Sequence, residues 1–248
     1  MKKKELVQES STVEVERVND EDSLNIVFKP NAGPQTDFLA AGEREVLYGG
    51  SAGGGKSYAM LADPLRYMGH PSFSGLLLRH TTEELRELVW KSQEIYPKIW
   101  KGIKWSERKM QWTAPSGARL WMSYLDRDDD VLRYQGLAFS WIGFDELTQW
   151  NKPFAWNYMR SRLRTAASDL PIYMRATTNP GGPGHGWVKK MFIDPAPYGK
   201  TFDATDIETG EVLKYPAGHS KAGQSLFKRK FIPARLSDNP YLSREGDY

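Results

Sequence analysis

The sequence predicts an α/β fold in which helices flank a mainly parallel central sheet that is extended by a β-hairpin. Three features indicate this fold: short apolar runs alternate with amphipathic helical stretches, a glycine-rich loop joins a strand to a helix, and a buried strand ends in two carboxylates. The 248 residues, of which 40% are hydrophobic and 26% charged, have an ordinary globular composition. This length suffices for one large domain or two small ones.

The expected elements follow from apolar periodicity and turn residues. Short apolar runs predict strands over residues 45–48, 74–79, 140–144, 171–178 and 230–236. Longer amphipathic stretches predict helices over residues 56–68, 82–100 and 153–164, with a further helix start at Pro34. Two alternating runs around Pro-Ser-Gly predict a hairpin over residues 109–124, and the chain between Gly181 and Gly223 is rich in Gly and Pro. Repeated strand–helix alternation favours parallel pairing.

Composition excludes several classes of protein. The absence of cysteine excludes disulfides and thiolate metal sites, and the four histidines lack the spacing of metal ligands. The longest stretch without a charged side chain, residues 176–188, is too short to span a membrane, so no membrane partner is expected. Residues 1–23 combine many charges with almost no aromatic side chains, which predicts a mobile N-terminal arm rather than a secretory signal. The packed domain is expected over residues 24–248.

A glycine-rich loop follows the first predicted strand. Residues 48–57 read YGGSAGGGKS, which contains the pattern G-x-x-x-x-G-K-[ST]. In such a P-loop the backbone amides surround phosphates, the lysine neutralises the β- and γ-phosphates, and the hydroxyl binds Mg²⁺. The sequence therefore predicts a P-loop NTPase that binds ATP and Mg²⁺. The expected phosphate-binding residues are Gly50, Ser51, Ala52, Gly53, Gly54, Gly55, Lys56 and Ser57, of which Ser57 also binds the metal.

The second motif is a strand that ends in two acids. Residues 141–146 read WIGFDE, and side chains alternate across a strand, so the two carboxylates take different directions unless the backbone turns at the tip. This arrangement allows two roles. Asp145 is expected to hold the magnesium shell, and Glu146 is expected to reach the attacking water, as hydrolytic ATPases require.

Further polar side chains are suited to a nucleotide. Gln35 lies near the predicted helix start, and its amide offers a donor and an acceptor that match the edge of adenine. Thr177, Thr178 and Asn179 end the strand after the carboxylate pair, at the edge of a parallel sheet where ligands bind. There they suit either sensing of the γ-phosphate or ordinary turn formation before Pro180.

Hydrolysis is faster when an arginine stabilises the charge of the transition state. The candidates are Arg79, Arg133, Arg160, Arg162 and Arg164, which end or flank the predicted strands and helices around the acidic pair. A spacing of two residues does not place the last three on one helix face, so at most one or two of them reach a single site. Arg79 and Arg162 are the preferred candidates for this arginine finger.

Positive charge is concentrated in the second half of the chain. Residues 151–235 hold 14 Lys and Arg against 6 Asp and Glu. This excess suits a polyanionic partner if it gathers on one face, and otherwise indicates a solvated surface.

The ordered set of motifs resembles the ATPase domain of the large terminase subunit of tailed bacteriophages, the motor that packages DNA into preformed capsids. The resemblance runs from about residue 30 to the end. It rests, in order, on PQTDFL, REVLYGGSAGGGKS, LLLRHTTEELRELV, YQGLAFSWIGFDELTQW, RSRLR, TTNPGGPGHGWVKKMF and FIPARLSDNPYL. It implies a parallel sheet with flanking helices, ATP with Mg²⁺, and double-stranded DNA, the portal protein and the small terminase subunit as partners. It also implies a homo-oligomeric ring and location in the host cell cytoplasm.

By matching position, the resemblance also implies roles for single residues. These are adenine binding by Gln35, phosphate and magnesium binding by Lys56 and Ser57, metal binding by Asp145, water activation by Glu146, and coupling of hydrolysis to movement by residues 177–179.

Two features depart from the family pattern. Ser51, Ala52, Gly53 and Gly54 are uncharged, whereas some family members carry a basic residue inside this loop that acts as a finger within the subunit. The finger is therefore expected elsewhere, in this chain or in the next subunit. Full-length relatives continue into a nuclease domain with an acidic metal-binding cluster, which this sequence does not contain. Either the sequence is a truncated piece or the nuclease is a separate chain, and no DNA cutting by this chain is expected.

Two other functions stay open from the sequence. A helicase or recombinase-type DNA-dependent ATPase shares the loop and the carboxylate pair. The other alternative is a nucleotide-gated docking module, which assembles on a partner and hardly hydrolyses nucleotide alone. The presence of Glu146 favours a hydrolytic enzyme over such a module.

Overall fold

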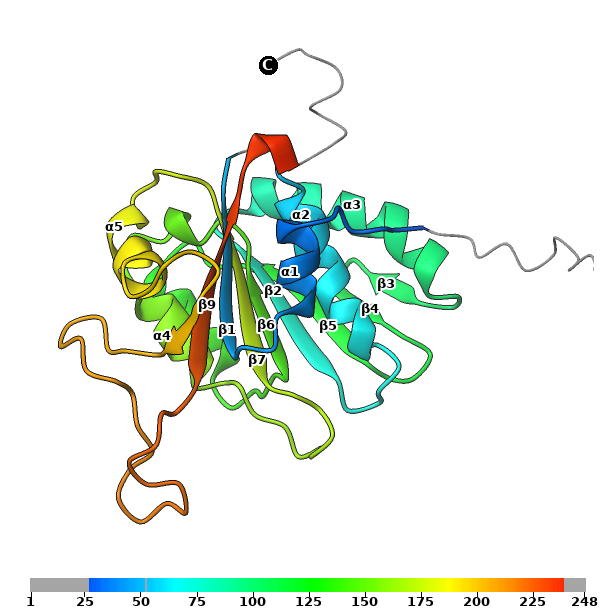
Figure 1. The fold of residues 1–248 in the computed structure, drawn as a ribbon. Helices are drawn as coiled ribbons and strands as arrows, with labels where there is room; N and C mark the ends of the chain where they lie inside the picture. Colours follow the sequence, from blue (N-terminus) through cyan, green and yellow to red (C-terminus); the bar gives the residue numbers. More distant parts are fainter. Residues whose placement is uncertain (1–26, 52, 239–248) are drawn as a thin grey trace, which may run out of the picture.

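The computed structural model describes residues 27–51 and 53–238, so the predicted arm over residues 1–23 and Ala52 lie outside the described part. A nine-stranded sheet forms its centre, in the order β3-β4-β5-β2-β6-β7-β1-β9-β8 (Figure 1). The strands are β1 Glu45–Gly50, β2 Ser74–Arg79, β3 Lys104–Ser106, β4 Gln111–Thr113, β5 Arg119–Tyr124, β6 Trp141–Phe144, β7 Tyr173–Thr178, β8 Thr201–Asp203 and β9 Lys228–Ala234.

The six central strands, β5, β2, β6, β7, β1 and β9, run parallel to one another. This confirms the predicted fold class. The predicted hairpin forms from β4 and β5, and β3 adds an antiparallel strand at this edge. β8 pairs antiparallel with β9 at the other edge. Strands β1, β2 and β6 are buried on both faces, which explains their nearly continuous apolar sequences.

Helices cover both faces of the sheet (Figure 1). One face carries α1 Pro34–Ala40, α2 Lys56–Ala62 and α3 Thr82–Ile99, and the other carries the 3₁₀ helix η3 Asp128–Tyr134, α4 Phe154–Arg160 and α5 His185–Val188. The first layer buries Phe38, Met60 and Leu88 against the sheet, and the second buries Val131 and Trp156. Within residues 27–51 and 53–238, no helix combines the length and the apolar character that crossing a bilayer requires.

Two predicted helices are shorter than expected. The helix predicted over residues 56–68 ends at Ala62, and the 3₁₀ helix η2 Asp63–Tyr67 continues the chain. Pro64 explains this change, because proline lacks the amide that an α-helical interior needs. The helix predicted over residues 153–164 already ends at Arg160.

Other elements match or exceed the expectation. α3 begins with a capping box formed by Thr81 and Glu84 and continues through Pro97, close to its predicted end. The Gly- and Pro-rich chain after Gly181 contains α5, the π-helical turn η5 Lys189–Ile193 and β8, none of which the sequence predicted.

A buried carboxylate at the start of β1 joins three elements. The Glu45 side chain is fully buried and binds Arg160 at the end of α4 and Arg229 on β9, the latter over 2.8 Å. Burial alone raises the pKa of Glu45, but the two guanidinium groups hold it below its usual value. This triad fixes α4 and β9 to the strand that leads into the glycine-rich loop.

We expect Glu45→Ala to lower the free energy of unfolding by about 3–5 kcal/mol, because the change leaves two guanidinium groups without their carboxylate. Urea denaturation followed by circular dichroism measures the loss. Glu87→Ala is the matched control, since Glu87 is exposed and pairs with Lys91 on the surface of α3, where a pair contributes about 0.3–0.5 kcal/mol. Equal losses in the two variants would contradict a structural role for the triad.

Candidate functional site

Three polar side chains lie side by side where adjacent parallel strands end. Arg79 ends β2, Asp145 follows β6 and Thr177 lies near the end of β7, and the residues just before them are paired across the sheet. Because side chains alternate along a strand, all three point to the face that α2 covers. The same alternation directs Thr178 to the opposite face.

These side chains form a compact buried cluster. Arg79 Nε lies 2.8 Å from Asp145 Oδ2, and Arg79 Nη1 lies 3.3 Å from Glu146 Oε2. The Thr177 hydroxyl donates to Asp145 Oδ1 and accepts a hydrogen bond of 2.9 Å from the Glu146 amide. Arg79 is 5% exposed and Asp145 is 1% exposed, so these charges are stabilised by each other rather than by water.

The backbone turns at Glu146, which lets its carboxylate approach the same arginine as Asp145. The φ angle of Glu146 is 61°, in the left-handed region, and the 3₁₀ helix η4 Leu147–Gln149 follows. Asn179 Nδ2 donates to Glu146 Oε1 over 3.1 Å, so with Arg79 both carboxylate oxygens have a partner. Burial raises the pKa of Glu146, an effect that Arg79 opposes and Asp145 reinforces.

The glycine-rich loop connects β1 with α2 and touches β9. At Gly50 the φ angle is 142°, and a Cβ would lie 1.8 Å from the carbonyl oxygen of Ala234. The same carbonyl accepts a hydrogen bond of 3.1 Å from the amide of Ser51. Gly55 has a φ of 70° and caps α2 in the left-handed conformation. Glycine is required at both positions, by the close approach of β9 at one and by the tight entry into α2 at the other.

Lys56 binds across this loop. Its Nζ donates to the carbonyl oxygen of Ser51 over 2.5 Å and to that of Gly50 over 3.4 Å, and the side chain is buried. Burial lowers the pKa of Lys56, and the negative charges of Asp145 and Glu146 oppose this shift. β1, which leads into the loop, and β6, which leads into the acidic pair, both pair in parallel with β7. The loop lysine and the acidic pair, far apart in the sequence, therefore lie at the same edge of the sheet.

Two side chains brace the loop in ways that the sequence analysis did not foresee. Gln35 Nε2 donates to the carbonyl of Gly55 over 2.9 Å, and its Oε1 accepts from the amide of Asn31 over 2.6 Å, so this buried side chain joins α1 to the loop. The Tyr48 hydroxyl donates to the carbonyl of Gly54 over 2.8 Å. Burial raises the pKa of Tyr48 to about 12, which keeps this donor protonated. Its position just before the glycines is the only sequence signal for this role.

A pocket of about 350 Å³ lies beside Gln35 and the end of the loop. Its lining residues are Val27, Phe28, Lys29, Asn31, Gln35, Gly55 and Tyr58. Phe28 and Tyr58 provide flat apolar surfaces next to the Gln35 amide, and Tyr58 is 39% exposed. This combination suits a planar ring with polar edges.

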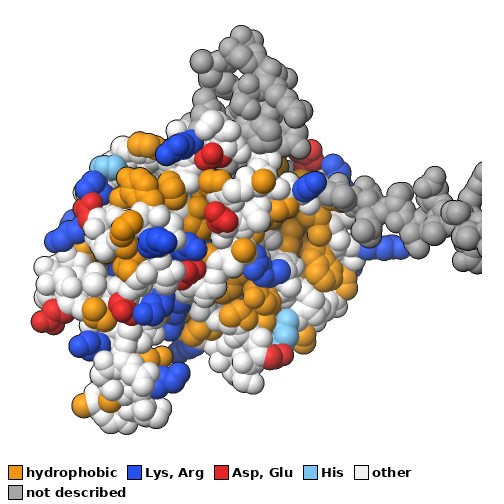
Figure 2. Space-filling view, in the orientation of Figure 1, with side chains coloured by type: hydrophobic (Ala, Val, Ile, Leu, Met, Phe, Trp, Pro, Cys, Tyr) orange, Lys and Arg blue, Asp and Glu red, His pale blue; other side chains and the backbone are white. Residues whose placement is uncertain are grey.

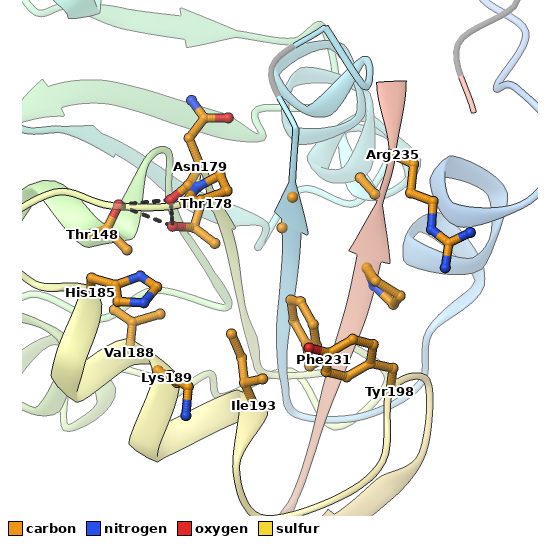
Figure 3. Close-up of a pocket in the computed structure, with 15 residues that line it drawn as sticks. Thr148, Thr178, Asn179, His185, Val188, Lys189, Ile193, Tyr198, Phe231 and Arg235 are labelled. Atoms are coloured by element: carbon orange, nitrogen blue, oxygen red, sulfur yellow. Dashed lines mark hydrogen bonds between the residues drawn. The ribbon is translucent and has the colours of Figure 1, made fainter. Parts of the chain in front are cut away.

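A second cavity, of about 280 Å³, lies on the other face of the sheet (Figure 3). Figure 3 shows His185 of α5 on one side of it and Phe231 of β9 on the other. Thr178 borders the cavity, and its hydroxyl donates to that of Thr148 over 3.1 Å. Residues 177–179 therefore face different sites: Thr177 contacts the acidic pair, whereas Thr178 faces this cavity.

Four of the five arginine candidates have other partners. Arg133 and Arg164 donate to backbone carbonyls, and Arg160 binds Glu45. The guanidinium of Arg162 lies 5.3 Å from the centre of the Tyr158 ring. The Arg162 carbonyl accepts from the amide of Phe139, just before β6 begins, whereas the acidic pair lies at the other end of β6. Of the five candidates, Arg79 alone contacts the acidic pair of its own chain.

The strand order, the glycine-rich loop after β1 and the acidic pair after β6 define a P-loop NTPase fold. The sequence profile of the family described as terminase large subunit, T4likevirus-type, N-terminal, matches residues 47–205. Because the match covers more than half of the sequence, this chain belongs to that family. The predicted resemblance is thereby confirmed.

Solved terminase structures share this fold. The large terminase of a thermophilic bacteriophage matches with a TM-score of 0.54 and 14% identity, over 87% of this chain and 49% of that one. Another crystal form of that protein, in complex with ADP, matches with a TM-score of 0.53 and 16% identity, over 87% of this chain and 48% of that one. The large terminase ATPase domain of Thermus phage P74-26 matches with a TM-score of 0.54 and 12% identity, over 88% of this chain and 86% of that one.

This chain thus spans about half the length of the first large terminase. No curated protein matches the sequence.

We expect Arg79→Gln to raise the pKa of Glu146 further, because Arg79 is the main group that opposes the effect of burial on this carboxyl. Titration of the carboxyl carbon by NMR measures the shift. Arg133→Gln is the control, since Arg133 pairs with Asp130. A Glu146 pKa that stays unchanged in Arg79→Gln would contradict the ion pair between the two side chains.

Proposed function

We propose that this chain is the ATP-hydrolysing motor domain of a viral DNA-packaging terminase, which couples ATP hydrolysis to translocation of double-stranded DNA into a procapsid. The position of Lys56 at the same sheet edge as the acidic pair Asp145 and Glu146, in a chain of the terminase large subunit family, carries the proposal. The ADP complex of the related thermophilic phage terminase supports a nucleotide as the ligand.

In this proposal the loop binds the phosphates of ATP. The proposed ligands are Gly50, Ser51, Ala52, Gly53, Gly54, Gly55 and Lys56. On binding, Lys56 exchanges its loop carbonyl partners for phosphate oxygens, a stronger interaction between opposite charges.

The adenine ring is proposed to occupy the pocket between Phe28 and Tyr58. Gln35 binds the protein with one N–H and one oxygen lone pair, which leaves its second N–H and second lone pair for the ring edge.

Ser57 and Asp145 are the proposed protein ligands of Mg²⁺. Asp145 Oδ2 is buried and accepts no hydrogen bond from the described residues, although Arg79 lies beside it. A carboxylate and a hydroxyl suit Mg²⁺, which keeps several waters and takes further oxygens from phosphates. Residues 27–51 and 53–238 contain no cluster of three His, Cys, Asp or Glu that indicates a different metal centre. When bound, the ion neutralises charge that develops on the phosphates.

Glu146 is proposed to orient the attacking water and to accept its proton. The pKa of this carboxyl, raised by burial, makes it a better proton acceptor than an exposed glutamate. Asn179 and Arg79 each bind one of its two oxygens, and each oxygen keeps a further acceptor position for the water. Thr177 and Asn179, which bind the acidic pair directly, are therefore the proposed link between hydrolysis and movement, with Thr178 contributing from the far face.

Arg79 is the arginine of this chain that is proposed to stabilise the negative charge of the transition state. Arg162 lies at the start of β6, whereas the acidic pair follows the end of this strand. Arg162 is therefore proposed to act, if at all, on a nucleotide bound to a neighbouring copy of the chain. Residues 24–248 are proposed to form one ATPase domain.

Family membership supports double-stranded DNA, the portal protein and the small terminase subunit as proposed partners, a homo-oligomeric ring as the proposed assembly, and the host cell cytoplasm as the proposed location.

We expect Glu146→Gln to lower kcat for ATP hydrolysis by about 10²–10⁴-fold, because the amide keeps the shape of the side chain but accepts no proton. Nucleotide affinity stays close to that of the unmodified protein. Phosphate release and titration with a fluorescent ATP analogue measure the two quantities. Glu84→Gln is the control, since Glu84 lies near Glu146 but caps α3. Undiminished turnover in Glu146→Gln would remove this residue from the mechanism.

We expect Lys56→Ala to weaken ATP binding by about 10–100-fold, because a charge-assisted contact to the phosphates is lost. The same fluorescence titration measures the affinity, with Lys104→Ala on the edge strand β3 as control. Unchanged affinity in Lys56→Ala would count against the phosphate-binding role of the loop.

A further inference from the structure

A long part of the sequence before the end of the described chain has no carboxylate. Residues 212–237 contain no Asp or Glu. Their basic residues are Lys214, Lys221, Lys228, Arg229, Lys230 and Arg235. A stretch of this kind resembles the charge pattern of a surface that binds a polyanion, provided that its cations are exposed and unpaired.

Residues 213–226, which we call the basic lobe, form a hairpin that projects from the sheet. The amide of Leu226 donates to the carbonyl of Leu213 over 2.7 Å, and that of Tyr215 donates to the carbonyl of Gln224 over 3.0 Å. All residues from 216 to 224 are exposed. The lobe leads directly into β9 and hangs below the sheet in Figure 1, at the end remote from α1 and α2. Figure 2 shows it standing clear of the body, with Lys and Arg side chains nearby.

The tip of the lobe is ordered by an aromatic stack. The rings of Tyr215 and His219 lie 4.4 Å apart and nearly parallel, and Lys221 Nζ lies 6.0 Å from the centre of the Tyr215 ring. These contacts hold the turn in one shape, so the lysines project from a defined support and lose less entropy on binding than lysines on a flexible loop.

The two lysines of the lobe are unpaired, unlike Lys228, Arg229 and Lys230 on β9. Lys214 and Lys221 are exposed and form no ion pair with the described residues. Lys228 pairs with Asp203 and Arg229 with the buried Glu45. The lobe therefore offers positive charge that the protein itself does not neutralise.

The nearest acidic residues belong to the preceding hairpin. Asp206 binds the amides of Glu208 and Thr209, each over 2.9 Å, and so caps its own turn. Glu208 and Glu211 are exposed on that hairpin and would repel a polyanion there. A polyanionic partner of the basic lobe is thereby disfavoured on the preceding hairpin.

We propose that the basic lobe contacts the phosphates of duplex DNA through Lys214 and Lys221. Apart from the stacked ring of Tyr215, the apolar side chains of its tip are limited to Pro216, Ala217 and Ala222, which provide neither the large buried anchors of a protein interface nor those of a membrane surface. Charge complementarity alone remains, and it fits a phosphate backbone without regard to base sequence. This inference rests on the proposed function for the identity of the polyanion.

The test measures how salt affects binding of the full chain to a fluorescein-labelled duplex of about 30 base pairs, by anisotropy at about 50 to 200 mM salt. Each lost phosphate contact lowers the slope of log affinity against log salt by about one, so Lys214→Ala/Lys221→Ala is expected to lower it by about two. The control is Lys98→Ala/Lys101→Ala, which removes equal charge at the end of α3, near the opposite edge of the sheet. The slope of the control is expected to match that of the unmodified chain.

A second duplex of unrelated sequence is expected to give the same loss. An unchanged slope in the lobe variant, an equal loss in the control, or no duplex binding by the unmodified chain at the lowest salt would overturn the proposal. ATP hydrolysis without DNA is measured on the same samples, and the lobe variant is expected to retain it. Absence of hydrolysis by the unmodified chain would contradict the proposed function. If hydrolysis is intact but the lobe variant and the unmodified chain have the same salt slope, only the lobe proposal is contradicted.

Discussion

The arrangement of the central strands depends on pairing a few buried charges. Arg79 and Asp145 are almost inaccessible to water, and an unpaired charge at either position costs several kcal/mol, about 3–5 when one partner of a buried pair is removed. Arg79 therefore requires the acidic pair, and β6 must lie beside β2 in the observed register. Thr177 adds β7 by binding Asp145 and the amide of Glu146. The order β2-β6-β7 and the geometry of the site follow from one electrostatic constraint.

The polar groups of the site bind one another, which determines what a ligand must offer. Lys56 donates to two loop carbonyls, and Glu146 has a partner on each oxygen. A ligand exchanges these hydrogen bonds for others, so the gain is small unless the new bonds are stronger. The bonds of Lys56 to carbonyls already have a charged donor, so only a charged acceptor adds attraction between opposite charges. Phosphate oxygens meet this requirement for Lys56, and an uncharged ligand does not.

The sequence predicts the parts of this molecule that depend on local pattern. The glycine motif, the acidic strand end and the alternation of strands and helices are local, and the fold class follows from them. Contacts between distant segments carry no such signal: the sequence gives no reason to place Ala234 against Gly50, or Arg229 against Glu45. The opposite directions of Thr177 and Thr178 do follow from strand alternation, once the strand is known to extend through both.

Strand β9 runs from the basic lobe at one end of the strands to the glycine-rich loop at the other. Its seven residues, about 3.3 Å apart along the strand, span roughly 20 Å from the basic lobe to the glycine-rich loop. It is fixed to β1 near both ends, by Arg229 bound to Glu45 and by the Ala234 carbonyl bound to the Ser51 amide. A shift of register by one residue would break the buried ion pair and place Arg229 on the wrong face of the sheet. The lobe and the loop are therefore held at opposite ends of one strand whose register against β1 is fixed.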